Sequence, residues 1–225
     1  MIYEVDQTAQ ASRYFSKEVR YSQIDWSSLD GIVDAFKQRI LDWYSEPAAE
    51  LAKNGHFAFA VMALNCLQID TLSQFVSGKD SSDASEFKKF IRGRLPSVYS
   101  CQLRTSIQHD DGSRQKTLTD VADVLYHGYR CGILHQAHIP PYGGVDPGAS
   151  HAAQVIIPGL AKYKSTGLNC PMVTLNPLLL LNDVRAAFEQ YLSELKDRDT
   201  KHDQLRANFK SKFSSSFGVD VTGAV

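Results

Sequence analysis

The fold is decided by the segment from Phe57 to Val76, FAFAVMALNCLQIDTLSQFV, which is the most apolar stretch of the chain. Apolar side chains lie on nearly all sides of this segment when it is wound as a helix, and Asn65 and Asp70 are among the polar residues embedded in it. A helix that is apolar all round is buried by its neighbours. Gly78 follows, in the position where a left-handed residue commonly ends a helix. We therefore expect a central core helix, with Asn65 held in a hydrogen-bond network.

Helical patterns also occur on both sides of this core segment. The first covers about 27–47 and should end near Pro47, because proline cannot sit inside a helix. A short amphipathic helix covers 87–95 and stops before a proline. The last long helix covers 176–196, where Asn176 caps the first turn. Together with the core segment, these helices predict a mainly α fold.

A further long helix carries the densest group of polar side chains. Thr117-Leu-Thr-Asp120 has the spacing of a capping box, in which Thr is followed three residues later by an acid. The helix that it opens should run to Ile139, because Pro140-Pro141 ends it.

The remaining segments are shorter or irregular. Glycine- and proline-rich turns alternate with β-branched pieces over 142–175 and predict a small β-hairpin excursion. Asp110-Asp111-Gly112 predicts a turn. Residues 1–25 are expected to form an irregular arm, 196–212 a shorter helix, and 214–225 a frayed tail.

The composition is that of a globular protein. The chain has 225 residues, of which 43% are hydrophobic and 22% charged, and its formal net charge is −1. This length predicts a single domain, which we place over residues 1–213. The composition excludes wholesale disorder, and the near-zero charge excludes a nucleic-acid binder held by bulk positive charge.

The cysteines and the apolar runs bear on the compartment. Cys66, Cys101, Cys131 and Cys170 show no C-x-x-C spacing, which excludes a zinc ribbon or a redox motif and indicates reduced thiols. The residues that follow Met1 carry no secretory signal. The uninterrupted apolar runs are shorter than the ~18 residues that a membrane span needs. We expect a soluble, cytoplasmic protein that does not enter a membrane.

The candidate chemistry lies on the helix from Tyr126 to His138, YHGYRCGILHQAH. At about 100° per residue, four side chains on this helix form one stripe, whereas Arg130 and His135 lie about 140° apart. On an ideal helix, those two residues would not point at the same atom. The residues of the stripe are His127, Cys131, His135 and His138.

The sequence Arg130-Cys-Gly-Ile-Leu-His135 resembles the R-x(4 to 6)-H motif of the HEPN superfamily, and the order of helices around it is similar. The resemblance implies a HEPN-like helical bundle with a small β-hairpin insertion after the motif helix. It also implies a metal-independent endoribonuclease without a cofactor. Its partners would be RNA and a second copy of the chain, with an antitoxin or other protein partner as a further expectation. Bacterial stress, toxin or phage-defence systems are the expected setting.

In such an enzyme, Arg130 and His135 would be the catalytic residues. An imidazole suits the removal of a proton from the ribose 2′-OH, and a guanidinium stabilises the charge that builds on the phosphorus. The expected products are a 2′,3′-cyclic phosphate and a 5′-OH. Because the two side chains diverge on an ideal helix, the resemblance predicts that Arg130 of one protomer meets His135 of the other.

Other residues are expected to support this site. Asp70 would orient the motif arginine, while Tyr126 and Tyr129 would flank the site and stack on a base. Cys131 stands where active relatives often carry Asn or Asp. Phosphate contacts are expected from a basic cluster that comprises Lys88, Lys89, Arg92 and Arg94, with Arg104 and Arg114 near it.

Gly128 and Gly132 weaken the motif helix by ~1 kcal/mol each relative to alanine. The close approach of another helix, in a tight symmetric dimer, is the reason that we expect for them.

Three other interpretations of the motif helix are open. In the first, Arg130 is a surface arginine and His135 is a structural histidine. In the second, a non-catalytic HEPN-like dimer binds RNA or a protein partner, as Cys131 after the arginine suggests. In the third, the stripe holds a metal ion for a hydrolase, since His and Cys four residues apart can chelate.

Overall fold

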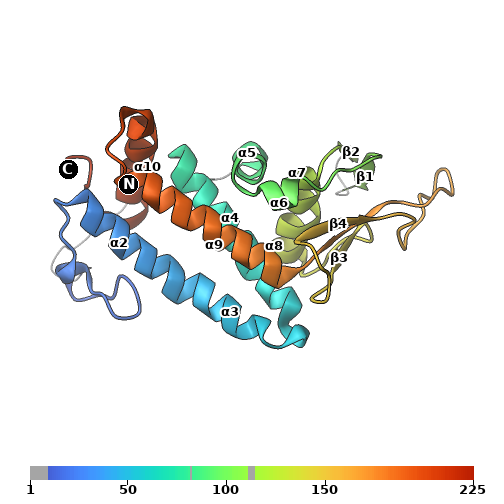
Figure 1. Cartoon of the computed structure of the whole chain (residues 1–225), viewed down its shortest axis with the longest axis horizontal. Coiled ribbons are helices and arrows are strands. Elements are labelled where there is room, and N and C mark those ends of the chain that lie inside the picture. The colour runs from blue at the N-terminus through green and yellow to red at the C-terminus, as the bar shows by residue number, and fades with distance from the viewer. Residues whose placement is uncertain (1–9, 82, 111–114) are drawn as a thin grey trace.

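Long helices run side by side along the long axis of the molecule, and both sheets lie at the end remote from the two termini (Figure 1). The structure is a computed structural model, and it describes residues 10–81, 83–110 and 115–225. The predicted mainly α class is confirmed. Its elements are η1 (Tyr21–Gln23), α2 (Leu29–Ile40), η2 (Leu41–Ser45), α3 (Glu46–Ala52), η3 (Gly55–Phe57), α4 (Ala58–Ser77), α5 (Ala84–Arg94), α6 (Pro96–Tyr99), β1 (Ile107–Asp110), β2 (Gln115–Leu118), α7 (Val121–Val124), η4 (Leu125–Cys131), α8 (Gly132–Gln136), β3 (Gly143–Val145), β4 (Ala153–Ile156), β5 (Met172–Leu175), α9 (Pro177–Lys196), η5 (Thr200–His202) and α10 (Asp203–Phe217).

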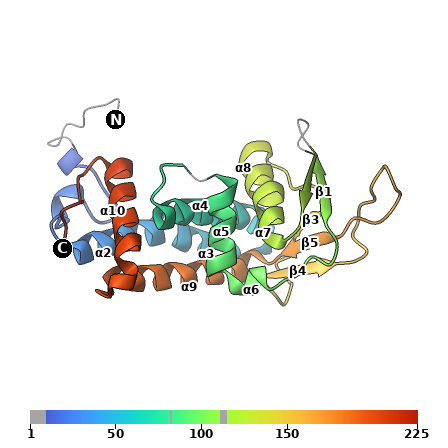
Figure 2. The ribbon, with the colours of Figure 1, turned by 90° about the horizontal axis from the view of Figure 1, so that it is seen from above.

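Helix α4 is the predicted core helix. It packs against α5, α9 and α10. In the view of Figure 2, α5 crosses it. Val61, Met62 and Ile69 are fully buried. The helix ends at Gly78, whose φ of 74° is the left-handed conformation predicted for this position. Asn65 donates from Nδ2 to the carbonyl of Pro177 at 2.9 Å, which confirms its structural role.

The stretch Gly55–Ser77 is long and apolar enough, by length and composition alone, to cross a membrane. The uninterrupted apolar runs are too short for a membrane span, but this longer segment, which includes polar residues, is not. Half of its most apolar window is buried inside the fold. Gln68 is buried in it and accepts a hydrogen bond from Ser45 Oγ at 2.6 Å.

The first predicted helix does not end at Pro47. Helix α2 continues through the π-helical segment η2 into α3, where Pro47 occupies the first turn. A proline is tolerated there because its missing N–H is not needed for an intrahelical bond. The wider turn of η2 starts a new helix just before the proline, so helical structure extends to Ala52.

The motif helix is built from α7, η4 and α8, and it begins later than predicted. Asp120, not Thr117, caps it, with the carboxylate accepting from the backbone N–H of Asp123 at 2.8 Å. Thr117 instead pairs with Gln108 in a two-stranded antiparallel hairpin of β1 and β2, which the sequence analysis did not predict. The helix ends at Gln136, because the next residue has a φ of 50°.

The predicted excursion over 142–175 is a three-stranded sheet in the order β3-β5-β4. It is not a simple hairpin, because β3 pairs with β5 in parallel and only β4 and β5 are antiparallel. Helix α9 follows β5 directly, capped by Asn176 as predicted. The predicted turn at 110–112 falls largely outside the described residues.

The tail over 214–225 is packed, contrary to prediction. Helix α10 continues to Phe217, whose ring lies 4.5 Å from that of Phe213. Val221 and Ala224 are buried, and Val225 donates its backbone N–H to the carbonyl of Ser27. The residues of this stretch are mostly small and polar, but its few apolar side chains pack onto the core. In the predicted arm, residues 10–25 contribute the buried ring of Phe15, and residues 1–9 lie outside the described part.

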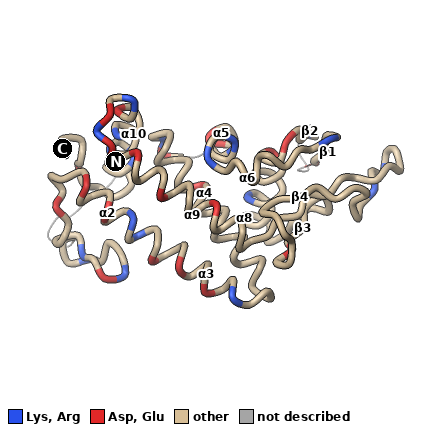
Figure 3. Tube along the Cα trace, in the orientation of Figure 1, with Lys and Arg blue, Asp and Glu red and all other residues tan. Residues whose placement is uncertain are grey.

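Charged residues of both signs alternate over the described helices (Figure 3). Many of them are joined in ion pairs between helices, such as Lys37 with Glu189 and Lys196 with Asp34. This distribution agrees with the near-zero net charge.

Candidate active site

Arg130 and His135 meet within one chain. Nη1 of Arg130 lies 2.9 Å from Nε2 of His135, although an ideal helix would separate the two side chains by about 140°. Arg130 lies in the π-helical segment η4, whose wider turn bonds residue i to residue i+5. This geometry brings residues five apart closer to one face. The expectation that they converge only through a second copy of the chain is therefore wrong.

Asp70 of α4 holds the other side of the guanidinium. Its Oδ1 accepts from Arg130 Nε at 3.2 Å and its Oδ2 from Nη2 at 3.4 Å. The two side chains are only 17% and 15% exposed, so the pair is shielded from water. Burial alone would lower the pKa of Arg130, but the hydrogen bonds and negative charge of Asp70 outweigh it and raise that pKa. The predicted orienting contact of Asp70 is present.

The contact with Arg130 defines the state of the His135 ring. A guanidinium has five N–H donors and no acceptor, so Nε2 of His135 must accept the hydrogen bond. In this contact the N–H of the ring is therefore on Nδ1. The contacts with Asp70 and His135 use three of the five donors of Arg130, and two remain to address an anion.

The two predicted flanking tyrosines have different positions. The ring of Tyr126 lies 5.6 Å from Cζ of Arg130 and also contacts Phe87, so it is beside the site. Tyr129 is fully buried, and its hydroxyl lies 2.7 Å from the carbonyl of Gly144 and 2.6 Å from that of Val173. It joins the motif helix to the sheet, and it is not accessible to stack on a base.

The predicted histidine and cysteine stripe is divided between two faces. His127, Cys131 and His138 line a cavity of about 640 Å³, whereas His135 faces Arg130. The widened turn of η4 and the end of the helix at Gln136 break the stripe. Within residues 10–81, 83–110 and 115–225, no three His, Cys, Asp or Glu side chains are placed to hold a metal ion. The proposed metal site of the third interpretation therefore has no ligand set in the described chain.

The glycines of the motif helix accommodate neighbours from the same chain. A Cβ added to Gly132 would lie 2.4 Å from the carbonyl oxygen of His138, and one added to Gly128 would lie 2.9 Å from the ring of Tyr142. The segment after the motif helix folds back against it, and this close approach explains both glycines. A dimer interface is not needed to account for them.

The predicted RNA-binding cluster on α5 is largely engaged in ion pairs. Lys88 binds Asp123 at 2.9 Å and Arg92 binds Asp120 at 2.6 Å, both at the start of the motif helix. Arg94 pairs with Glu194 of α9 at 2.6 Å, whereas Lys89 is exposed. Three of the four cations thus hold α5 in place, and phosphate binding by the cluster stays a prediction. Arg104 is exposed, and Arg114 lies outside the described residues.

Sequence reasoning missed the residues that surround the cavity. His109 of β1 and Lys116 of β2 reach it from the unpredicted hairpin, and Tyr142 and Lys162 reach it from the segments around the sheet. They are spread along the chain, and no local pattern in the sequence linked them.

No family model, curated protein or solved structure matches the chain.

Proposed function

We propose that the chain is a metal-independent endoribonuclease of the HEPN type, acting in the cytoplasm in bacterial stress, toxin or defence. The observation that carries the proposal is the contact of Arg130 with His135, with Asp70 fixing the guanidinium from behind. A base and a fixed cation at one point are what cleavage of RNA without metal requires. The resemblance of the Arg130–His135 motif to HEPN proteins agrees with this chemistry.

The proposed reaction begins with entry of an RNA phosphate between the two side chains. The two remaining N–H donors of Arg130 bind its oxygens, and Nη1 turns from His135 to the phosphate. Nε2 of His135 is then free to take the proton of the ribose 2′-OH. The 2′-oxygen attacks phosphorus and the bond from phosphorus to the 5′-oxygen breaks. Water protonates the leaving 5′-oxygen, and His135 returns its proton to the solvent, giving a 2′,3′-cyclic phosphate and a 5′-OH.

A homodimer is part of the proposal. Phe59 and Leu67 are 40% and 37% exposed on α4. On an ideal helix they lie within about 80° of each other, and Asp70 lies between them. The exposed apolar surface therefore borders the Arg130 site. A second copy of the chain packed over it would form one RNA-binding groove from two sites, without sharing catalytic residues between protomers.

The second candidate is a non-catalytic HEPN-like dimer that binds RNA or a protein partner. Cys131, which follows Arg130 in the motif, favours it, because a thiol is a weaker hydrogen-bond donor than Asn. In this candidate, the pair of Arg130 and His135 holds an RNA phosphate without proton transfer.

RNA cleavage in the presence of EDTA tests the two candidates. The wild type should cut single-stranded RNA to fragments with cyclic phosphate ends. His135→Ala should lower the rate by about 10²- to 10⁴-fold, and Arg130→Ala by about 10²- to 10³-fold. The exposed residues His151 and Arg13 provide matched alanine controls. RNA binding without cleavage by the wild type would favour the second candidate, and full cleavage by both site variants would refute the first.

A further inference from the structure

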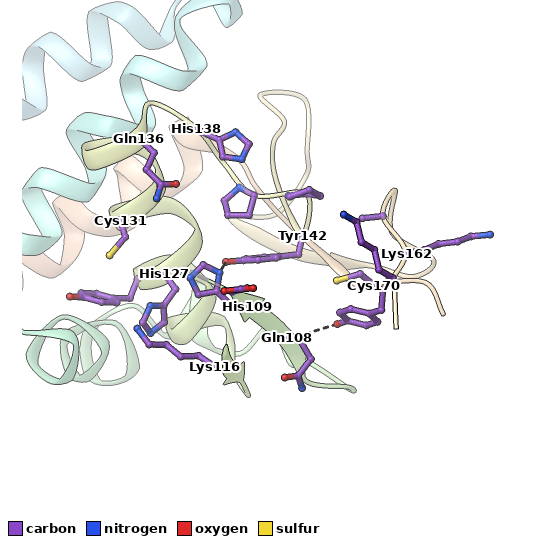
Figure 4. A pocket seen from close by; sticks show the side chains of 18 residues that line it. Gln108, His109, Lys116, His127, Cys131, Gln136, His138, Tyr142, Lys162 and Cys170 are labelled. Carbon is purple, nitrogen blue, oxygen red and sulfur yellow. Dashed lines mark hydrogen bonds between the residues drawn. The ribbon is translucent and has the colours of Figure 1, made fainter. Parts of the chain in front are cut away.

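A cavity of about 640 Å³ lies beside the motif helix, on the face next to that of Arg130 and His135. Its lining comes from several segments (Figure 4): Cys131 and Gln136 belong to the motif helix, Lys116 to the hairpin and Lys162 to the loop before β5. This volume is within the range of about 300–1,000 Å³ that is typical of small-molecule sites.

Tyrosine and histidine rings line this cavity. The Tyr142 hydroxyl lies 2.8 Å from Nδ1 of His109, and the ring centres of His109 and His127 are 5.4 Å apart. Tyr126 lines the same wall, with its ring 5.0 Å from that of His127. Stacked and edge-on aromatic surfaces of this kind receive planar rings well.

Two polar side chains of the interior, His127 and Tyr142, are uncharged at neutral pH. Burial and the positive charge of Lys116 lower the pKa of His127 to about 4, and burial raises the pKa of the Tyr142 hydroxyl. Both side chains therefore offer neutral donors and acceptors, which suit the edge of a nucleobase.

The rim of the cavity is cationic. Lys162 and Lys164 are exposed at its mouth and Lys116 is half-buried, whereas Asp110 is the acidic residue of the lining. The lining thus contains three lysines and one aspartate. A ligand with a planar, uncharged part and a negatively charged part would match this arrangement. A nucleotide has both.

We infer that this cavity binds one nucleotide of the RNA strand, with its base among Tyr142, His109 and His127 and its phosphate at Lys162 and Lys164. A second hollow of about 380 Å³ shares His109, Tyr163 and Lys164 with it, so the strand has room to continue.

The position of the cavity links it to the proposed cleavage site. Cys131 and Gln136 line the cavity, and they directly follow Arg130 and His135 in the motif helix. The two faces are therefore adjacent on one helix. A strand that wraps this helix end places one nucleotide in the cavity and a neighbouring phosphate at Arg130. The identity of the ligand as part of RNA rests on the proposed function, whereas nucleotide binding does not.

Calorimetric titration with the four nucleoside 5′-monophosphates, each alone, tests the inference. At least one should bind with a dissociation constant of ~1 mM or tighter, and Lys162→Gln/Lys164→Gln should weaken it by about 10-fold. A matched pair of charge changes, Lys53→Gln/Lys201→Gln, should have no effect, because both lysines lie outside the cavity lining. No binding of any nucleotide, equal binding by the double variant, or equally tight binding of inorganic phosphate alone would overturn the inference.

Cysteine alkylation locates the bound nucleotide. Cys131 lines the cavity and is half-buried, and Cys101 is half-buried outside the cavity lining. The nucleotide that binds should slow the reaction of iodoacetamide with Cys131, read by mass spectrometry, and should leave Cys101 unchanged. Slowing of both thiols or of neither would place the ligand elsewhere.

Failure of this inference is distinguishable from failure of the nuclease proposal. If the wild type binds nucleotides and protects Cys131 but never cuts RNA, the cavity assignment stands and the nuclease proposal fails. If it cuts RNA through His135 without binding any nucleotide, the reverse holds.

Discussion

Nη1 of Arg130 lies 2.9 Å from Nε2 of His135 in the same chain, across the junction of η4 and α8. The two residues are too far round an ideal α-helix to meet, and the π-helical turn that contains Arg130 allows the contact. Each copy of the chain therefore holds a complete pair. This relationship changes what a dimer would contribute, because the partner is not needed to supply either residue.

Mixing two inactive variants tests this relationship. When Arg130→Ala and His135→Ala proteins are denatured together and refolded, mixed dimers should show no more RNA cleavage than each variant alone. In a mixed dimer, no chain keeps both residues of the pair. Recovery of cleavage on mixing would show that the site combines Arg130 of one protomer with His135 of its partner. Mixing each variant with wild type provides the control for refolding.

The apolar surface around Asp70 should carry the dimer. Phe59→Asp/Leu67→Asp places two charges on this surface, and burial of an unpaired charge is costly. The double variant should therefore sediment as a monomer in analytical ultracentrifugation, and the wild type as a dimer. Leu160→Asp is the control, since Leu160 is 89% exposed on the loop before β5. A monomeric wild type would contradict the proposed dimer.

His127 should make the stability of the fold depend on pH. Burial, followed by the positive charges of Lys116, His109 and Lys88, lowers its pKa from 6.5 to about 4, against the opposing charge of Asp123. Between pH 6.5 and 4, the unfolded chain binds a proton at this ring that the folded chain does not. Stability from this group is thus full above pH 6.5 and is lost as the pH falls toward 4, by about 2 kcal/mol.

Urea unfolding at pH 7 and pH 4.5 measures this dependence. His127→Gln should lose about 1 kcal/mol less than the wild type over this range, because glutamine does not titrate. His151→Gln, an exposed ring on the segment before β4, should follow the wild type. An unchanged pH dependence in His127→Gln would contradict the assignment.

The two helical glycines Gly132 and Gly93 should respond to alanine in opposite directions. Gly132→Ala places a Cβ 2.4 Å from the carbonyl of His138, so the backbone must move and the free energy of unfolding should fall by about 1–3 kcal/mol. Gly93→Ala on α5 meets no atom within 4 Å and should raise it by up to about 1 kcal/mol. Thermal unfolding of both variants checks this. Equal stability of the two would show that His138 does not pack on the motif helix.

Sequence reasoning predicted the elements whose signals are local. The apolar stretch of α4, its end at Gly78 and the capping of α9 by Asn176 are readable because each depends on residues that are neighbours in the chain. The contact of Asp70 with Arg130 was expected from the family resemblance of the motif, and not from local pattern.

Features that depend on distant segments were not readable. Nothing in the run from Leu125 to Cys131 marks a π-helix, and four-residue strands such as β1 and β2 are too short for a clear alternation. The packed tail was not predicted either, because Val221 and Ala224 are isolated apolar residues that are buried only by joining the main core.

The amino-acid sequence by itself determined the helical class, the core helix and the residue types of the motif, because helix formation and burial follow from periodicity along the chain. The tertiary structure alone decided that Arg130 and His135 meet within one protomer, that Tyr129 is buried and that His109, His127 and Tyr142 enclose a cavity. These outcomes depend on a one-residue change in helical winding and on side chains dozens of residues apart, and local pattern carries no information about either.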